Sequence, residues 1–265
     1  MSSIAAVTPT ICRLMGVEPP RLSSAEALQR VLGDAKAKGI EGRVRKAFIY
    51  APDVLGEGVY RDYETLYKHV KELAPVEVEM RSVLPTSTPV CFASMFTGAE
   101  PEAHGIRRYE KPVLGCDTLF DAVSRAGRRV AIVAVKDSSI DLIFRGRAID
   151  YYTETYDPEV VRRALSLLGE GVYDLMVAYN QEYDDMMHRS TPRSLEAIEA
   201  FKRHLEAFRV LGETFNEAYA AENRVIAFYP DHGTHVDPAT GKGAHGTDAA
   251  DDVDVRHFRG INRGG

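Results

Sequence analysis

The chain has 265 residues, of which 45% are hydrophobic and 27% are charged, a balance typical of a folded globular protein rather than a disordered one. Its net charge of −6 and the lack of any run of Lys or Arg argue against binding of a nucleic-acid duplex through its phosphates as the main function. A small anionic substrate is not excluded, because bound metal ions can reverse the local field of an acidic site.

The three cysteines Cys12, Cys91 and Cys116 are far apart in the sequence, and no CxxC motif occurs. This pattern argues against a disulfide framework or a cysteine-rich zinc site, and it is typical of a reducing compartment. Residues 1–16 have neither a basic start nor a long apolar core. We therefore expect no signal peptide, no membrane anchor and a cytoplasmic protein of unknown oligomeric state.

Helices and strands alternate along most of the chain. Helical patterns occur, in order, at 9–16, 24–37 (with Ser23 or Ser24 as its cap), 61–72, 89–96 (ending at Gly98), 118–126, 158–168 and 191–220. Strand patterns occur at 46–50, 76–83, 129–135, 173–179 and 224–229, and 141–152 reads as a small hairpin or one further strand. The alternation predicts an α/β protein, with a three-layer α/β/α sandwich around a largely parallel sheet, formed by a single domain over residues 1–265.

Polar side chains follow several of these strands directly. Asp53 comes after the strand at 46–50, Thr88 after that at 76–83, Asp184 and His188 after that at 173–179, and Asp231-His232 after that at 224–229. Ligands of open parallel sheets bind outside the carboxyl ends of the strands, so we expect these side chains to be neighbours.

Carboxylates and imidazoles that converge on one hydroxyl form the ligand set of a metal site with a nucleophile. Oxygen and nitrogen ligands without thiolate suit Zn²⁺, Mn²⁺ or Mg²⁺. Asp184 and His188 lie on one face of a helical turn, a spacing that favours Asp184 over Asp185. A hydroxyl such as that of Thr88 becomes a nucleophile when a metal withdraws its proton, and a helix N-terminus there supplies N–H groups for phosphate oxygens.

The segment 85–106 resembles the nucleophile region of the type I phosphodiesterase/nucleotide pyrophosphatase family, in the alkaline-phosphatase superfamily. It contains Pro-Thr-x-Thr ending at Thr88, then Thr-Gly, then Pro-x-x-His-Gly-Ile, at matching spacing. Asp184-x-x-x-His188 and Asp231-His232-Gly resemble the next two motifs, and the His-Gly at His245 resembles the last.

The resemblance implies an alkaline-phosphatase-like fold with two divalent cations, most simply Zn²⁺, and a small phosphate-ester or nucleotide substrate. One cation would be held by Asp184, His188 and His245. The other would be held by Asp53, Asp231, His232 and the oxygen of Thr88. Ions about 4 Å apart clamp the attacking and leaving oxygens of an in-line displacement. Thr88 would form a phosphorylated or nucleotidylated intermediate that water then releases.

One departure from the family pattern concerns substrate binding. The family has Asn three residues after the nucleophile, in contact with the phosphate, and this chain has Cys91 there. Cys91 is then expected to line the substrate pocket beside Thr88. His235 remains an alternative ligand to His245, and His204 and His257 are expected at the surface or partly packed.

Several functions remain open on this scaffold. A phosphodiesterase or nucleotide pyrophosphatase fits the motifs best, a phosphomonoesterase is an alternative, and a metal- or anion-binding relative without turnover is a third. A phosphomutase carries a large cap domain, for which 265 residues leave little room. A sulfatase needs a modifiable Cys or Ser followed by Pro-x-Arg, and Cys91 is followed by Phe92-Ala-Ser.

Overall fold

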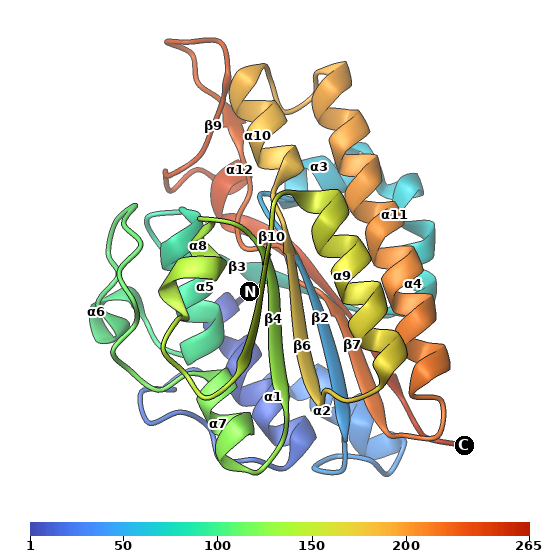
Figure 1. The fold of residues 1–265 in the computed structure, drawn as a ribbon. Helices are drawn as coiled ribbons and strands as arrows, with labels where there is room; N and C mark the ends of the chain where they lie inside the picture. The colour runs from blue at the N-terminus through green and yellow to red at the C-terminus, as the bar shows by residue number, and fades with distance from the viewer.

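An eight-stranded sheet forms the centre of the computed structural model, which describes residues 1–265 (Figure 1). The strands lie in the order β1 (Ser2–Ser3), β3 (Val76–Arg81), β10 (Asp254–Asn262), β7 (Arg224–Phe228), β2 (Lys46–Pro52), β6 (Leu175–Asn180), β4 (Val130–Val135) and β5 (Asp150–Glu154). Every neighbouring pair is parallel except the two pairs that β10 makes, with β3 and with β7. The predicted α/β class and largely parallel sheet are confirmed.

Helices cover both faces of the sheet, which gives the three predicted layers (Figure 1). One face carries α1 (Val7–Met15), α2 (Gln29–Ala37), α5 (Thr88–Thr97), α7 (Leu119–Arg125) and α8 (Ser139–Ile143). The other carries α3 (Glu57–Asp62), α4 (Lys68–Leu73), α9 (Asp157–Glu170) and α11 (Leu195–Ala218). Shorter elements complete the chain: η1 (Ile4–Ala6), η2 (Glu64–Tyr67), α6 (Pro101–His104), α10 (Glu182–Arg189), α12 (Ala250–Val253) and the hairpin β8 (His235–Val236) with β9 (Gly243–Ala244).

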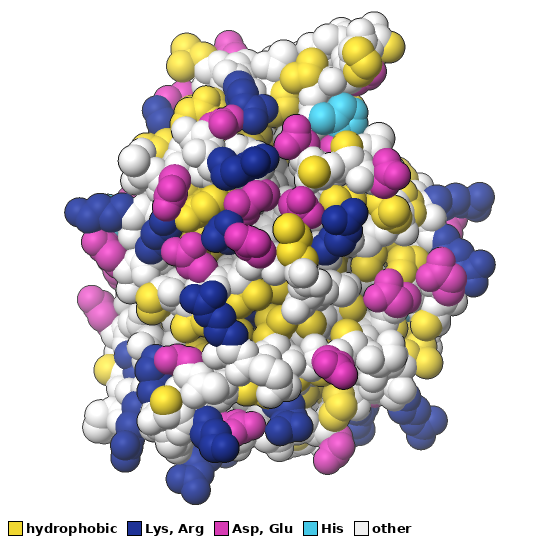
Figure 2. Space-filling model, turned by 180° about the vertical axis from the view of Figure 1, so that it is seen from behind, with side chains coloured by type: hydrophobic (Ala, Val, Ile, Leu, Met, Phe, Trp, Pro, Cys, Tyr) yellow, Lys and Arg dark blue, Asp and Glu magenta, His cyan; other side chains and the backbone are white.

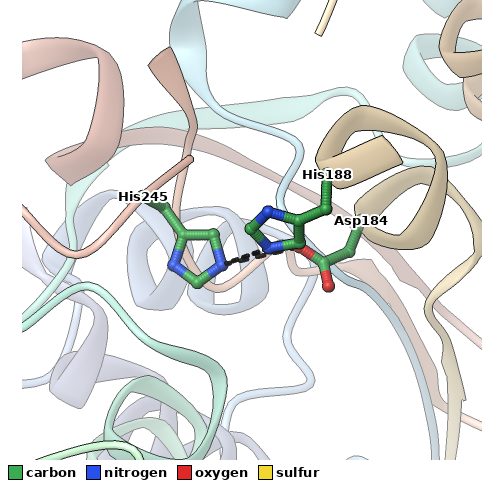
Figure 3. A group of neighbouring side chains, drawn as sticks. All are labelled: Asp184, His188 and His245. Carbon is green, nitrogen blue, oxygen red and sulfur yellow. Dashed lines mark hydrogen bonds and ion pairs between the residues drawn. The ribbon is translucent and has the colours of Figure 1, made fainter. Parts of the chain in front are cut away.

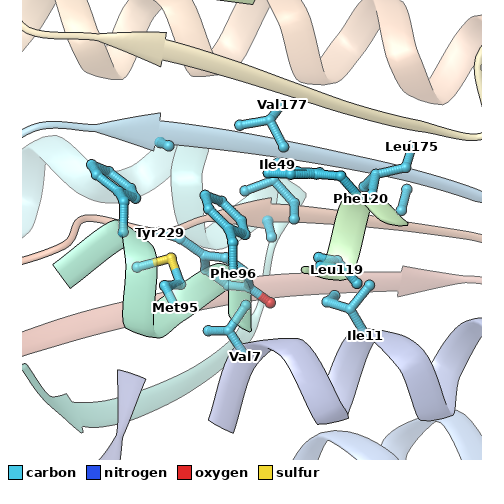
Figure 4. Close-up of a cluster of buried hydrophobic side chains, with 14 of the residues drawn as sticks. Val7, Ile11, Ile49, Met95, Phe96, Leu119, Phe120, Leu175, Val177 and Tyr229 are labelled. Atoms are coloured by element: carbon cyan, nitrogen blue, oxygen red, sulfur yellow. The ribbon is translucent and has the colours of Figure 1, made fainter. Parts of the chain in front are cut away.

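The two helical layers bury two separate hydrophobic cores. The first, between α1, α5, α7 and the sheet, includes Phe96 and Phe120, whose ring centroids are 4.9 Å apart (Figure 4). The second lies under α9 and α11 and includes Phe208 and Phe228, at 5.2 Å. Because β4 and β6 are covered on both sides, all of their residues are buried and their sequences are apolar runs, broken only by Asn180 at the end of β6.

The register of the parallel strands determines where the chain leaves the sheet. Tyr50 on β2 is paired with Phe228 on β7, and Asp53 and Asp231 each come three residues later. These two aspartates therefore emerge side by side at the carboxyl edge. No separate cap domain covers this edge, and none of the helices is long and apolar enough to cross a bilayer.

Four regions differ from the sequence prediction. The single helix expected at 61–72 is divided among α3, η2 and α4. Of the hairpin or further strand predicted for 141–152, the structure has the strand, β5, but it begins only at Asp150, and Ser138 caps the short helix α8 before it. Helix α2 begins at Gln29, and neither Ser23 nor Ser24 caps it. The C-terminal tail contains β10, which was not predicted.

Candidate functional site

The first ligand group lies beyond β6, where α10 begins. Asp184 and His188 are one turn apart on α10, and His245 approaches them from the segment after β9 (Figure 3). The Nε2 atom of His188 is 3.1 Å from Asp184 Oδ1 and 3.1 Å from Nε2 of His245. His245 Nε2 is 3.5 Å from the same carboxylate oxygen. One oxygen and two nitrogens thus meet at one point, close enough together to hold one metal ion.

Hydrogen bonds to carbonyl oxygens fix the orientation and the tautomer of the His188 and His245 rings. Nδ1 of His188 is 2.9 Å from the carbonyl oxygen of Gly243, and Nδ1 of His245 is 2.8 Å from that of Thr86. A carbonyl oxygen only accepts, so both Nδ1 atoms carry hydrogen and both neutral rings turn an Nε2 lone pair toward Asp184 Oδ1. That oxygen is buried without a donor. Three acceptors facing one another require a cation or a proton between them.

The second group lies at the ends of β2 and β7 and is fully buried. His232 Nε2 is 3.3 Å from Asp231 Oδ2 and 3.9 Å from Asp53 Oδ1, while its Nδ1 donates to Gly233 O at 3.0 Å. Asp231 Oδ2 and His232 Nε2 have no hydrogen-bond partner. These atoms are again acceptors without a donor, which is the chemistry of a second cation site.

The electrostatics of the site favour positive ions. Burial, and then the charges of Asp231 and Asp184, raise the pKa of Asp53 well above its usual range. Burial raises the pKa of Asp231 to about 8. The pKa of Asp184 is lowered, because its hydrogen bonds with His188 and then His245 outweigh its burial. Without cations, the site therefore takes up protons at neutral pH in place of metal charge.

Thr88 lies at the N-terminus of α5, and its side chain faces Asp53. Its Oγ1 is 3.4 Å from each carboxylate oxygen of Asp53, and the residue is 5% exposed. The phenol of Tyr179 on β6 donates to the same carboxylate. Asp53 therefore links the predicted nucleophile to the second ligand group.

The structure brings together all seven predicted ligand and nucleophile residues, but it does not place Cys91 with them. The Cys91 thiol is fully buried, 3.1 Å from Ser82 Oγ, and does not line the cavity at the site. The two alternative ligands are also engaged elsewhere. Asp185 accepts from Tyr156 OH at 2.5 Å, and His235 Nδ1 is 2.7 Å from Asp252.

Two supporting features were not predicted from the sequence. Tyr179 read only as the last residue of a buried strand. Val54 has a φ of 63°, an unusual value for a β-branched residue, and its N–H donates to Asp231 Oδ1 at 3.2 Å. This turn ties the loop after β2 to the aspartate after β7. The Val after Asp53 carried no sequence signal for such a turn.

A cavity of about 630 Å³ opens onto Thr88, Asp53 and the first ligand group. Only 2 of its 18 lining residues are hydrophobic, so its occupant is polar. Arg108, Lys111 and Lys136 line the wall of this cavity. Lys136 forms no ion pair, whereas Arg108 pairs with Glu110 at 2.9 Å. The face of the molecule seen from behind the view of Figure 1 mixes both signs of charge without a continuous basic surface (Figure 2).

Comparison with known proteins agrees with this arrangement. The family described as type I phosphodiesterase/nucleotide pyrophosphatase matches residues 58–112, which include Thr88. No curated protein sequence matches the chain. Among solved structures, phosphonoacetate hydrolase from Sinorhizobium meliloti 1021 in complex with phosphonoformate is 19% identical, with a TM-score of 0.58, over 73% of this chain.

Two further structures share the fold. An inactive variant of murine ectonucleotide pyrophosphatase/phosphodiesterase 5, in which a Thr is replaced by Ala, was solved with AMP and is 18% identical, with a TM-score of 0.57, over 72% of this chain. A 2-O GAG sulfatase is 12% identical, with a TM-score of 0.59, over 84% of this chain and 64% of its own.

At these identities the likeness concerns the fold. The chain spans 57% of the length of the hydrolase and of the murine protein. The resemblance found in the sequence is confirmed: residues 58–112 match the type I phosphodiesterase/nucleotide pyrophosphatase family, and the chain has the fold of its alkaline-phosphatase-like neighbours.

Proposed function

We propose that this protein is a two-metal phosphoesterase that hydrolyses a phosphodiester or a nucleotide pyrophosphate through a covalent intermediate on Thr88. The observation that carries the proposal is the position of the Thr88 hydroxyl, at a helix N-terminus and 3.4 Å from both oxygens of Asp53. The inactive Thr-to-Ala variant of the murine protein, bound to AMP, supports a threonine as an essential group in this fold.

The residues of the site fit two divalent cations, because their buried acceptor atoms lack donors. One would be held by Asp184, His188 and His245, and the other by Asp53, Asp231, His232 and Thr88 Oγ1. Bound there, such ions act as Lewis acids toward the phosphoryl oxygens and lower the pKa of a coordinated hydroxyl. The mixed nitrogen and oxygen ligands suit Zn²⁺ best, with Mn²⁺ or Mg²⁺ as alternatives.

The side chains of the chain position the reactants. Asp53, held by Tyr179, accepts the hydroxyl hydrogen of Thr88 and so orients this hydroxyl at the wall of the cavity. The Thr88 hydroxyl loses its proton by way of Asp53 to water, and Oγ1 forms a bond to phosphorus while the bond to the leaving oxygen breaks and that oxygen takes up a proton from water. A second water then hydrolyses the bond between phosphorus and Thr88 Oγ1. Lys136, exposed in the cavity wall without an ion pair, attracts an anionic substrate. Positioning and charge account for most catalysis of phosphoryl transfer.

We propose that residues 1–265 act as one phosphoesterase domain, because the ligands come from segments between Asp53 and His245 around a single sheet. The natural substrate is expected to be small and polar, in keeping with the cavity lining.

Hydrolysis of bis-p-nitrophenyl phosphate and of p-nitrophenyl phosphate by one preparation tests the proposal. We expect diester hydrolysis that a chelator abolishes and Zn²⁺ or Mn²⁺ restores, with metal content near two ions per chain. Thr88→Ala should lower kcat by several orders of magnitude without changing Tm. A faster monoester reaction would reassign the protein as a phosphomonoesterase. Two bound ions without turnover of either ester would make it a binding protein.

A further inference from the structure

The phosphate-binding side of the site lacks the amide side chain that the family resemblance places there. Cys91, at the corresponding position on α5, is 0% exposed, and its thiol lies 3.1 Å from Ser82 Oγ and 3.9 Å from Val83 O. Burial raises the pKa of this thiol well above its usual range, so it stays neutral. Cys91 therefore faces the loop behind the helix and does not reach a phosphate on Thr88.

Ser87 is the one cavity-lining residue whose buried hydroxyl has no partner. It directly precedes Thr88, lines the cavity and is 6% exposed, and its Oγ forms no hydrogen bond. A serine just before a helix ordinarily accepts from an N–H two or three residues later. Here Pro89 has no N–H, and the N–H of Val90 donates to the Ser87 carbonyl at 3.0 Å. The Ser87 hydroxyl therefore does not cap the helix. A buried hydroxyl without a hydrogen-bond partner is unfavourable, unless a bound ligand supplies that partner.

The main chain supplies a second donor next to this hydroxyl. The N–H of Ser87 donates to Pro85 O at 2.8 Å, whereas the N–H of Thr88 donates to no atom in the structure. The ten-residue helix α5 begins at Thr88, so this free N–H also lies at the positive end of the helix dipole. Two donors adjacent in the chain therefore stand beside the proposed nucleophile.

Resting on the proposed function, we propose that Ser87 Oγ–H and Thr88 N–H bind the non-bridging oxygens of the phosphoryl group, in the role of the absent amide. The bond from Thr88 Oγ1 to phosphorus forms and the bond to the leaving oxygen breaks, while Ser87 keeps its proton throughout. The ligand of these two donors is a tetrahedral oxyanion, which is either the phosphoryl group of an ester or inorganic phosphate. Charge on these oxygens strengthens both hydrogen bonds.

The test uses the full chain loaded with metal and three variants. Ser87→Ala removes the hydroxyl, and Ser87→Thr keeps it on an extended backbone that a β-branched residue tolerates. Ser23→Ala is the matched control, because Ser23 Oγ is also buried without a partner but lies beside Gly98, at the other end of α5. Each is measured for diester kcat, for inorganic phosphate Kd by calorimetry, and for Tm and metal content.

Ser87→Ala is expected to weaken phosphate binding about 10-fold and to lower kcat about 10²-fold. Its Tm and metal content should not fall, since the hydroxyl has no partner to lose. Ser87→Thr and Ser23→Ala should stay near wild type.

The outcomes separate this inference from the proposed function. If wild type hydrolyses the diester and Ser87→Ala matches it in kcat and Kd, Ser87 has no such role although the enzyme assignment stands. If the wild type hydrolyses no ester but binds inorganic phosphate, and Ser87→Ala no longer binds it, the oxyanion site stands and the enzyme assignment fails. An equal loss in Ser23→Ala would make the effect structural and overturn the inference.

Discussion

Removal of metal should make the stability of this protein fall as pH rises from 6.5 to 8. Asp231 has a pKa of about 8 in the metal-free fold, raised by burial, and that of Asp53 is also raised. An unfolded Asp titrates near 3.9, so in this window the folded state binds at least one proton more than the unfolded state. The free energy of unfolding then decreases with rising pH.

The magnitude follows from one excess proton. The slope is about 1.4 kcal/mol per pH unit, or about 2 kcal/mol between pH 6.5 and 8. For a chain of this size, roughly 2–4 °C of Tm corresponds to 1 kcal/mol, so the metal-free Tm should fall by about 4–8 °C. The pKa of His232 and that of His204 are lowered to about 3 by burial, so both rings give the opposite slope around their unfolded pKa of about 6.5, and the fall in stability is shallowest at the lower end of the window.

The assay is thermal unfolding by circular dichroism at pH 6.5, 7.2 and 8.0, in chelator and with two equivalents of Mn²⁺ or Zn²⁺. Metal ligation removes the excess protons of the site, so the loaded protein should keep only the smaller slope of Asp157, whose pKa burial raises to about 7, and loading at pH 7 should release about one proton or more per chain. A metal-free Tm that stays constant or rises, or an equal slope with metal, would refute the argument that buried carboxylates hold protons in place of ions.

Three substitutions test other parts of the molecule. Tyr179→Phe removes the donor to Asp53 and should weaken one metal site by about 10–100-fold in a chelator competition; unchanged affinity would contradict the role of the phenol. Asp252 accepts from Thr247, close to His245, so Asp252→Asn should leave about one tightly bound ion per chain by elemental analysis, and two would speak against it. Phe96→Ala, at the centre of the first core, should cost about 3–5 kcal/mol in urea unfolding, and a loss below about 1 kcal/mol would show that this core is not tightly packed.

The strands that carry the site were predictable because they are buried on both faces. β2 and β6 are continuous apolar runs, and their covered faces give sequence signals that need no tertiary knowledge. The ligand residues were predictable because parallel strands end at a shared edge of the sheet, where ligands bind, and because these residues lie in recognisable motifs. The structure places Asp53 and Asp231 in one ligand group and Asp184 in the other, and the two groups adjoin where the rings of His232 and His245 lie 4.3 Å apart.

The elements that were missed depend on contacts that a single sequence does not encode. β10 contains Arg259, which is fully buried and donates to Tyr229 OH at 2.6 Å. Because a charged residue is typical of an exposed segment, the sequence of this central strand was interpreted as a polar tail. His204 was expected near the surface. It is 1% exposed on α11, with Nδ1 2.9 Å from Tyr50 OH. His257 is buried as well. Cys91 was expected in the pocket only because of its position three residues after Thr88. On α5 its side chain lies on the face toward Ser82 and not on the face toward the cavity.

The most direct test of the central claim is anomalous X-ray scattering at the zinc edge from crystals of the Zn²⁺-loaded protein. We predict two peaks about 4 Å apart. One should be bonded to Asp184, His188 and His245, and the other to Asp53, Asp231, His232 and Thr88 Oγ1. A single peak, or peaks bonded to other side chains, would contradict it.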